Sequence, residues 1–264
     1  MALFHTGSQY FKPASKKTGF SKQTCQPSLT NMVNNWFNII QDNLLPPTCI
    51  LCGQHGFDSQ DICHACFIDL EKNLCCCSRC AKILETTQLK PLLCGACIRQ
   101  TPAFDGTYAP FIYQDVLAYL VTTLKFNHQY KNARLLGYLL ANYLQKTAEL
   151  PEIIIPVPLH PQRFRERGFN QSIEIAKSLS RHLNIPIDTQ SCIRKRNTLH
   201  QIDLPARQRQ SNMKQAFKVK QPMKSRHIAI LDDVMTTGST VNELAKVLKQ
   251  SGVNRVDIWV CGRA

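Results

Sequence analysis

Residues 228–240 carry side chains at the spacing needed to bind a sugar phosphate. An apolar stretch ends at two adjacent carboxylates, Asp232 and Asp233, and a turn rich in hydroxyl groups follows: Thr236, Thr237, Gly238, Ser239 and Thr240. Apolar residues at helical spacing predict a helix over 241–249, so the turn offers free N–H groups and the positive end of a helix dipole to an anion. The two acids can accept hydrogen bonds from neighbouring hydroxyls of a ribose whose 5′-phosphate fills the turn.

The alternative for this run is an ordinary core strand followed by a capped helix, with both acids merely solvated. A capped helix needs one hydroxyl residue and no acid pair before it, so we favour the phosphate site. The run resembles the phosphoribosyl-diphosphate signature of type I phosphoribosyltransferases. That signature consists of a hydrophobic strand, two acids, a Thr-Thr-Gly core and a small hydroxyl residue.

Four Cys-x-x-Cys pairs follow one another in the first part of the chain. They are Cys49/Cys52, Cys63/Cys66, Cys77/Cys80 and Cys94/Cys97. Each pair presents two sulfurs on a tight turn, and two pairs make one tetrahedral thiolate site. A single pair could be buried or redox-active, but four in succession predict two zinc ribbons with two structural Zn²⁺ ions. His55 and His64 are expected at the surface, because the eight sulfurs already fill both sites.

The composition indicates a folded protein in a reducing compartment. The chain has 264 residues, 44% of them hydrophobic, which is enough for a full core and a small additional module. Eleven of the 13 cysteines precede residue 98 without a signal-peptide apolar region before them, so we expect metal binding in the cytoplasm rather than disulfides. No apolar run approaches the length of a membrane span. The net charge of +14 favours polyanionic ligands.

The chain is expected to have three parts. Residues 1–31 contain four lysines, no acid and no apolar period, which predicts a disordered leader and makes Met32 a plausible start. A targeting leader is less favoured, because no basic amphipathic helix is evident. Residues 32–100 are expected to hold an amphipathic helix and the double zinc ribbon, and residues 101–264 a phosphoribosyltransferase-like domain.

Beyond the cysteines, strand and helix patterns alternate. Strands are predicted at 106–113, 152–157, 228–231 and 256–260, and helices at 116–124, 134–144, 171–183 and 241–249. This alternation predicts an α/β fold with a mostly parallel sheet flanked by helices, of the type I phosphoribosyltransferase-like kind. The small zinc-ribbon module precedes it.

A basic segment follows the predicted strand at 152–157. It carries Arg163, Arg165 and Arg167, then Gly168, Asn170 and Gln171. A loop after a parallel strand lies at the same sheet edge as the acid pair, and guanidinium groups suit a diphosphate. The alternative, a solvated basic loop on an already charged protein, is less favoured because of this position after a core strand.

A second basic segment, from Arg194 to Arg226, contains ten Lys or Arg residues and a single acid, Asp203. It can be a mobile lid that closes over a charged substrate, or a surface that faces nucleic acid. Few aromatic residues are interleaved with these charges, so stacking on single-stranded bases has little support within this segment.

The cysteine ribbons, the Leu124-Lys125-Phe126 stretch, the Arg-Gly-Phe-Asn-Gln segment and the Asp-Asp turn together resemble the ComF family, including its GntX members, from Leu44 to the end of the chain. The resemblance implies a double zinc ribbon fused to a phosphoribosyltransferase-like domain that is associated with natural competence and the handling of incoming DNA. It also implies the phosphoribosyl-diphosphate role for Asp232, Asp233 and residues 236–240. Arg163, Arg167, Gly168, Asn170 and Gln171 match the family's basic segment. The leader and Cys75-Cys76 depart from the family pattern, and neither touches the turn at residues 236–240.

Two functions stay open at this point. In the first, the protein is a transferase: Mg²⁺ neutralises a bound diphosphate, the acid pair fixes the ribose, and the arginines and Lys125 stabilise the leaving diphosphate. In the second, the domain is a non-catalytic module that uses the phosphate turn for regulation or for DNA ends, with single-stranded DNA or proteins of the competence machinery as partners. The acid pair favours a ribose ligand, because general attraction to DNA does not explain two carboxylates.

Overall fold

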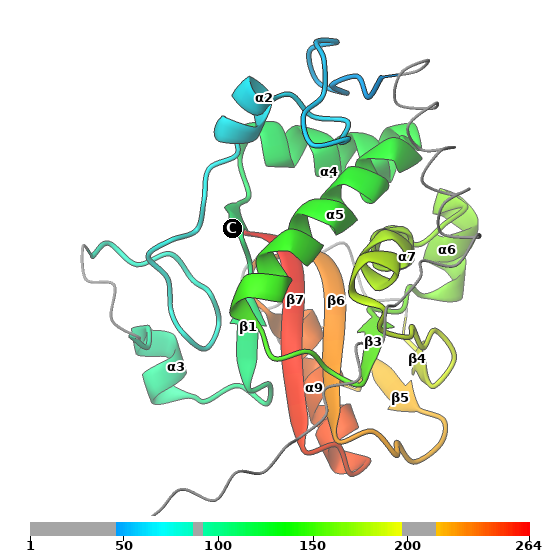
Figure 1. Cartoon of the computed structure of the whole chain (residues 1–264). Coiled ribbons are helices and arrows are strands. Elements are labelled where there is room, and N and C mark those ends of the chain that lie inside the picture. The colour runs from blue at the N-terminus through cyan, green and yellow to red at the C-terminus, as the bar shows by residue number, and fades with distance from the viewer. Residues whose placement is uncertain (1–45, 87–91, 197–214) are drawn as a thin grey trace, which may run out of the picture. The chain divides into compact units, whose positions relative to one another are not determined.

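The computed structural model describes residues 46–86, 92–196 and 215–264 (Figure 1). The expected leader at 1–31, the start at Met32 and the amphipathic helix before the first cysteine lie outside these residues. The elements, in chain order, are α2 His64–Ile68, α3 Gly95–Arg99, β1 Gly106–Tyr108, β2 Phe111–Ile112, α4 Asp115–Asn127, α5 Tyr130–Thr147, β3 Ile153–Pro156, α6 Pro161–Arg167, α7 Gln171–Leu183, β4 Cys192–Arg194, β5 Phe217–Val219, β6 His227–Met235, α9 Ser239–Gln250 and β7 Arg255–Arg263.

The main sheet is parallel and has five strands. Its order is β1-β7-β6-β3, and β2 continues along β7 beyond β1. The two long strands, β6 and β7, form the centre of the sheet, and β4 and β5 make a separate antiparallel pair. Because all strands of the main sheet run the same way, their carboxyl ends meet at one edge, where the polar residues of β6 lie.

Helices cover both faces of this sheet. Ala229 and Leu231 of β6 pack with α4, α5 and α7, whereas Ile228 and Ile230 pack with α9 on the opposite face. This alternation is the two-residue period of a strand, and burial on both faces explains the nearly continuous apolar sequence of β6 and β7. In Figure 1, α5 and α7 lie in front of the sheet and α9 behind it.

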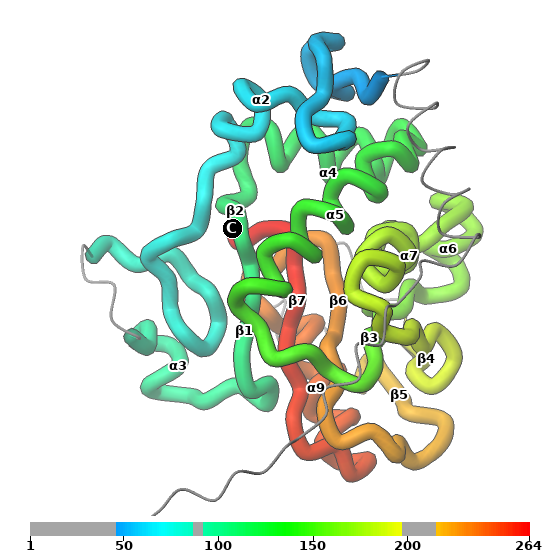
Figure 2. Tube along the Cα trace, in the orientation of Figure 1, coloured from blue at the N-terminus to red at the C-terminus, as the bar shows by residue number. Residues whose placement is uncertain are grey.

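The two cysteine ribbons join different cores. Cys49 and Cys63 belong to the core that contains α4 and α5, while Cys77 and Cys94 belong to the core that contains α9. The path from one ribbon to the other is seen in the tube of Figure 2, from blue to cyan-green. Each ribbon therefore supports a different face of the sheet.

The predicted fold class is confirmed: a mostly parallel sheet is flanked by helices and preceded by a zinc-ribbon-like region. Three local predictions differ from the structure. The strand expected at 106–113 is interrupted around Pro110, where proline cannot donate to a ladder. The basic segment expected as a loop contains helix α6, which begins with Pro161 after the N-cap His160. Strand β6 extends to Met235, so the acid pair lies inside the strand.

Residues 46–264 form one compact unit, and the boundary expected near residue 100 stays a prediction. Among the helices that the structure describes, none has the length and apolar character to cross a membrane.

Candidate functional site

The eight cysteines of the four pairs gather into two groups of four. Within each group all the sulfur atoms lie within 4.8 Å of one another: Cys49, Cys52, Cys63 and Cys66 in the first site, and Cys77, Cys80, Cys94 and Cys97 in the second. A tetrahedral Zn²⁺ with Zn–S bonds of about 2.3 Å separates its sulfurs by roughly 3.8 Å. The Sγ atoms of Cys80 and Cys94 are 3.7 Å apart, and those of Cys52 and Cys63 are 3.6 Å apart. Both sites therefore fit structural zinc.

Main-chain N–H groups donate to sulfurs in both sites. The N–H of Cys66 donates to Cys63 Sγ at 3.5 Å, and that of Cys94 donates to Cys77 Sγ at 3.3 Å. Such bonds stabilise thiolates, which are the form that binds metal. Cys75 and Cys76 belong to neither group, in agreement with the expected ligand register.

Purified protein is expected to contain two zinc ions per chain, measured by elemental analysis. Four sulfurs lie within 4.8 Å of one another in each site, and a metal ion holds such a group together, so we expect the fold of both ribbons to depend on zinc. Less than one zinc per chain would contradict this assignment.

The phosphate turn, residues 236–240, follows β6 and includes the start of α9. Gly238 is the N-cap of α9 with φ +75°, and a Cβ at this position would lie 2.6 Å from Met235 Cε. Glycine takes this backbone conformation without strain and leaves room for the end of the Met235 side chain. Ser239 and Thr240 form the start of α9, whose first turn contains no acid, so the positive end of its dipole faces the turn without an opposing side-chain charge.

The hydroxyl groups of the phosphate turn bond to one another. Thr237 Oγ1 and Ser239 Oγ are 2.8 Å apart, and the N–H of Ser239 donates to Thr237 Oγ1 at 3.4 Å. Thr236 and Thr237 are exposed. A phosphate that entered this turn would replace these weak local bonds with charge-assisted ones.

The two acids have different surroundings. Asp233 is buried, forms an ion pair with Lys125 of α4 and accepts a hydrogen bond from Gln171 Nε2 at 3.3 Å. Asp232 Oδ1 accepts from Ser172 Oγ at 3.0 Å and from the N–H of Asp233 at 3.0 Å. The acid pair, Lys125 and the start of α7 thus form one network. Three separate segments of the chain contribute to it.

These surroundings separate the pKa values of the acids. Burial, together with the neighbouring charge of Asp233, raises the pKa of Asp232 to about 7. Burial also opposes ionisation of Asp233, but the Lys125 ammonium outweighs it and lowers the pKa of Asp233 below its ordinary value. The pKa of Lys125 is lowered by burial and raised more strongly by Asp233, so its net shift is upward. Asp233 and Lys125 are a charged pair, while Asp232 gains and loses a proton near neutral pH.

The basic segment approaches this network through one of its three arginines. Arg167 Nη1 donates to Gln171 Oε1 at 2.6 Å, and burial lowers the pKa of Arg167. Asn170 caps α7 by accepting from the N–H of Ser172 at 2.9 Å, as expected for the start of this helix, and Gly168 ends α6 with φ +80°. The positive charge of Arg163 lies close enough to Arg167 to lower its pKa further. Arg165 is exposed to solvent.

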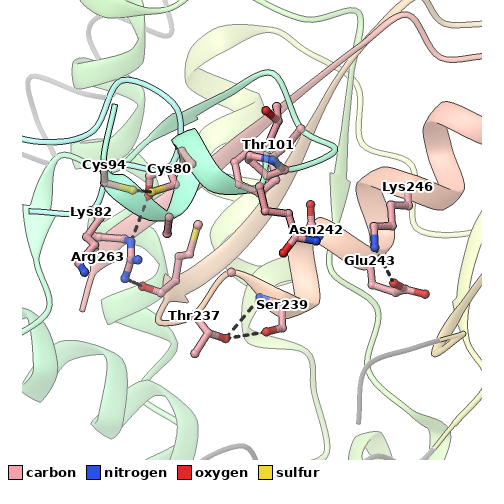
Figure 3. A pocket seen from close by; sticks show the side chains of 17 residues that line it. Cys80, Lys82, Cys94, Thr101, Thr237, Ser239, Asn242, Glu243, Lys246 and Arg263 are labelled. Carbon is pink, nitrogen blue, oxygen red and sulfur yellow. Dashed lines mark hydrogen bonds and ion pairs between the residues drawn. The ribbon is translucent and has the colours of Figure 1, made fainter. Parts of the chain in front are cut away.

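A cavity of about 330 Å³ lies beside the phosphate turn (Figure 3). Thr237, Gly238 and Ser239 line one side of it, and Cys80 and Cys94 of the second ribbon line the other. A second cavity of about 430 Å³ lies beyond the carboxyl end of β3, between α6 and β4. The first cavity places the second ribbon next to the turn, which the sequence did not predict.

Two residues of this region have no recognisable sequence signal. Ser172 contacts Asp232 from α7, and Arg263 reaches from β7 to Cys80 and Met235. Both contacts join segments far apart in the chain, so local patterns could not reveal them. Much of the second basic segment, including Asp203, Arg207 and Arg209, lies outside the described residues. Its described end contains Phe217, a core residue of β5.

Comparison with known proteins gives three results. The model of the double zinc ribbon domain family matches residues 40–102. Competence protein F of Haemophilus influenzae is 35% identical over 225 residues, which cover 82% of this chain and 96% of that protein. DNA utilization protein YhgH of Escherichia coli K12 is 34% identical over 221 residues, which cover 81% of this chain and 96% of that protein.

Among solved structures, partial matches are found with phosphoribosyl-handling proteins. Glutamine phosphoribosylpyrophosphate amidotransferase from B. subtilis matches with 18% identity and a TM-score of 0.34, over 49% of this chain and 26% of that chain. Purine phosphoribosyltransferase from Pyrococcus horikoshii matches with 20% identity and a TM-score of 0.31, over 50% and 73% of the two chains.

Proposed function

Because the chain belongs to the family of competence protein F and DNA utilization protein YhgH, we propose that it is a competence-associated, phosphoribosyltransferase-like protein that binds phosphoribosyl diphosphate with magnesium. One observation carries the ligand assignment: the acid pair lies near the end of strand β6, and the phosphate turn follows directly and begins α9, at the carboxyl edge of a parallel sheet. The names of the relatives support the role in the uptake and use of DNA.

Each part of the ligand has a counterpart in the site. The N–H groups of the phosphate turn and the hydroxyls of Thr236, Thr237 and Ser239 bind the 5′-phosphate. Asp232 accepts a hydrogen bond from a ribose hydroxyl, because it is the less buried residue of the pair and Asp233 is engaged by Lys125. Lys125 and Arg167 offset the negative charge of the diphosphate as it leaves the ribose C1.

The oxygen ligands available at this site also fit magnesium. Mg²⁺ prefers carboxylate and phosphate oxygens and is commonly held by one or two carboxylates together with substrate phosphates. Asp232 is the residue that would meet it, because Asp233 is engaged by Lys125 and Gln171. When bound, the ion would supply charge neutralisation to the diphosphate.

Calorimetric titration of the full chain with phosphoribosyl diphosphate and Mg²⁺ tests the proposal. Binding is expected to be tighter at pH 8 than at pH 6, because Asp232, with a pKa of about 7, must be ionised to accept a hydroxyl strongly. The ligand phosphate itself titrates near pH 6, so Asp232→Asn is the control and is expected to lose the part of the pH dependence that belongs to Asp232. Absence of binding at both pH values would refute the ligand assignment.

A second candidate function, binding of single-stranded nucleic acid without catalysis, is favoured by one surface. Phe126 at the end of α4 is 62% exposed, and the guanidinium of Arg167 lies 5.9 Å from its ring centroid. Tyr130 and Phe164 are exposed on the neighbouring helices. Exposed aromatic rings interleaved with arginines suit stacked bases and a phosphate backbone. The second basic segment has few aromatic residues among its charges, whereas the surface around Phe126 combines exposed aromatic rings with arginines.

Phe126→Ala tests this second candidate. If bases stack on the ring, its loss is expected to weaken binding of an oligothymidine probe by about tenfold, within the roughly 1–3 kcal/mol of one stacked base. Leu150→Ala, which removes an exposed apolar side chain outside this surface, is the control. Equal affinities of both variants and the unmodified chain, measured by fluorescence anisotropy, would exclude a base-stacking role for Phe126.

A further inference from the structure

Arg263 connects the second zinc site to the strand that ends at the phosphate turn. Its side chain is 6% exposed. Nε donates to the main-chain oxygen of Cys80 at 3.1 Å, and Nη1 donates to the main-chain oxygen of Met235 at 3.0 Å and also to that of Ala264. Figure 3 shows the guanidinium between the cysteines and the chain that leads to Thr237. A single buried side chain thus touches a zinc-site residue and the last residue of β6.

Both contacts of Arg263 determine local backbone geometry. Cys80 is a member of the second cysteine group, so its main chain is fixed when the metal is bound. Met235 immediately precedes the phosphate turn, and its side chain packs beneath Gly238, where a Cβ would come within 2.6 Å of it. A shift of Cys80 would be passed through Arg263 to Met235 and from there to Gly238.

A second contact links the same two regions. The N–H of Ala103, which follows α3, donates to Asn242 Oδ1 at 2.7 Å in the first turn of α9. Cys77 and Cys94 also share one hydrophobic core with Val241 and Leu244. The second ribbon is therefore attached to the phosphate turn and to the helix that the turn begins.

The first ribbon has its attachments elsewhere. Asp61 forms an ion pair with Arg134 of α5, and Cys49 and Cys63 pack in the core on the opposite face of the sheet. Loss of metal from the first site would act on the core of α4 and α5, not on α9. The two zinc sites therefore serve as internal controls for each other.

Electrostatics also favour a link between Arg263 and the second site. Four thiolates around one Zn²⁺ carry a net charge of about −2, which lowers the cost of burying a guanidinium nearby. Arg263 Nε lies 3.1 Å from the main-chain oxygen of Cys80, so the guanidinium is buried beside this cysteine group and would gain that compensation when the metal is bound.

We propose that Arg263 is a positioning residue through which zinc in the second site, but not in the first, maintains the phosphate turn in its binding geometry. The part of this inference that concerns ligand affinity rests on the proposed function. The part that concerns the turn itself does not. By linkage, a ligand in the turn must also raise the affinity of the second site for zinc.

Hydrogen–deuterium exchange of the full chain tests the coupling without any ligand. Cys49→Ser and Cys77→Ser are matched variants, since each removes the first cysteine of one site and both cysteines are buried. Exchange in residues 235–245, where the N–H of Asn242 bonds to Gly238 O at 2.9 Å, is expected to be at least fivefold faster in Cys77→Ser and in Arg263→Ala. It should be unchanged in Cys49→Ser. The amides of Ile153, Ile154 and Ile155 in β3 report any global loss of stability in each variant.

Arg263→Lys separates positioning from simple loss of packing. Lysine keeps the charge but cannot donate to two main-chain oxygens in the fixed geometry of a guanidinium, so intermediate exchange is expected. In the same set of variants, affinity for phosphoribosyl diphosphate should fall at least fivefold in Cys77→Ser and Arg263→Ala and stay within twofold in Cys49→Ser. Equal exchange at 235–245 in all variants, or equal acceleration in both cysteine variants, would overturn the coupling. Failure of the unmodified chain to bind phosphoribosyl diphosphate would instead count against the proposed function. It would leave the coupling intact, because the exchange experiment is done without ligand.

Discussion

Replacement of both Asp232 and Asp233 by alanine is expected to weaken binding of phosphoribosyl diphosphate by about tenfold or more. The double variant loses the Asp232 carboxylate, which accepts from a ribose hydroxyl and lies nearest the magnesium position, together with Asp233, the partner of Lys125. Charge-assisted bonds of this kind each contribute on the order of 1.5–3 kcal/mol. Calorimetric titration of the variant beside the unmodified chain measures this loss. Unchanged affinity would show that the ribose binds elsewhere.

The same double variant separates a ribose site from a nonspecific nucleic-acid surface. Removal of two negative charges makes the region more positive, so binding to single-stranded DNA is expected to stay the same or become slightly stronger. A parallel loss of both ligands would mean that a DNA end occupies the phosphate turn. Asp188→Ala, at an acid outside this network, shows how much the loss of one negative charge elsewhere in the chain changes DNA binding.

Lys125→Met is expected to destabilise the fold by about 3–5 kcal/mol at pH 8, the usual cost of leaving one charge of a buried pair without its partner. In the unmodified chain the lowered pKa of Asp233 contributes stability at neutral pH, which is lost only as the pH falls through that pKa. Without Lys125, burial raises the pKa of Asp233. The contribution of Asp233 to stability then falls, instead of rising, as the pH increases. The variant should then be less unstable at pH 5, where Asp233 takes up a proton, than at pH 8.

Denaturant unfolding at both pH values measures this effect. A second change, Asp233→Asn in the Lys125→Met background, removes the buried charge and should recover most of the stability at pH 8. Lys131→Met, at an exposed lysine of α5, is the control and should change stability little. If Lys125→Met unfolds with the same free energy as the unmodified chain at pH 8, the buried ion pair does not contribute as described.

The sequence predicted the parts of the site whose chemistry is local. The turn at 236–240 could be recognised because a glycine and hydroxyl residues at the start of a helix have a direct physical meaning, and Gly238 takes the positive φ that only glycine adopts readily. The cysteine pairs could be assigned for the same reason, since ligand spacing reflects metal geometry. Asn170 also caps α7 as expected.

Contacts between distant segments could not be predicted in this way. The bond from Ser172 to Asp232 and the bonds of Arg263 depend on how α7 and the second ribbon pack against β6, which no local pattern encodes. Helix α6 is a different case, because its signal was present: Pro161 follows the N-capping His160, and Gly168 ends the helix.

The most direct test of the ligand assignment is a crystal structure of the full chain grown with phosphoribosyl diphosphate and Mg²⁺. We expect the 5′-phosphate within hydrogen-bond distance of the N–H groups of Gly238, Ser239 and Thr240, with a ribose hydroxyl donating to Asp232. Density for the ligand at another place, with the phosphate turn still closed by the Thr237–Ser239 hydrogen bond, would contradict the account.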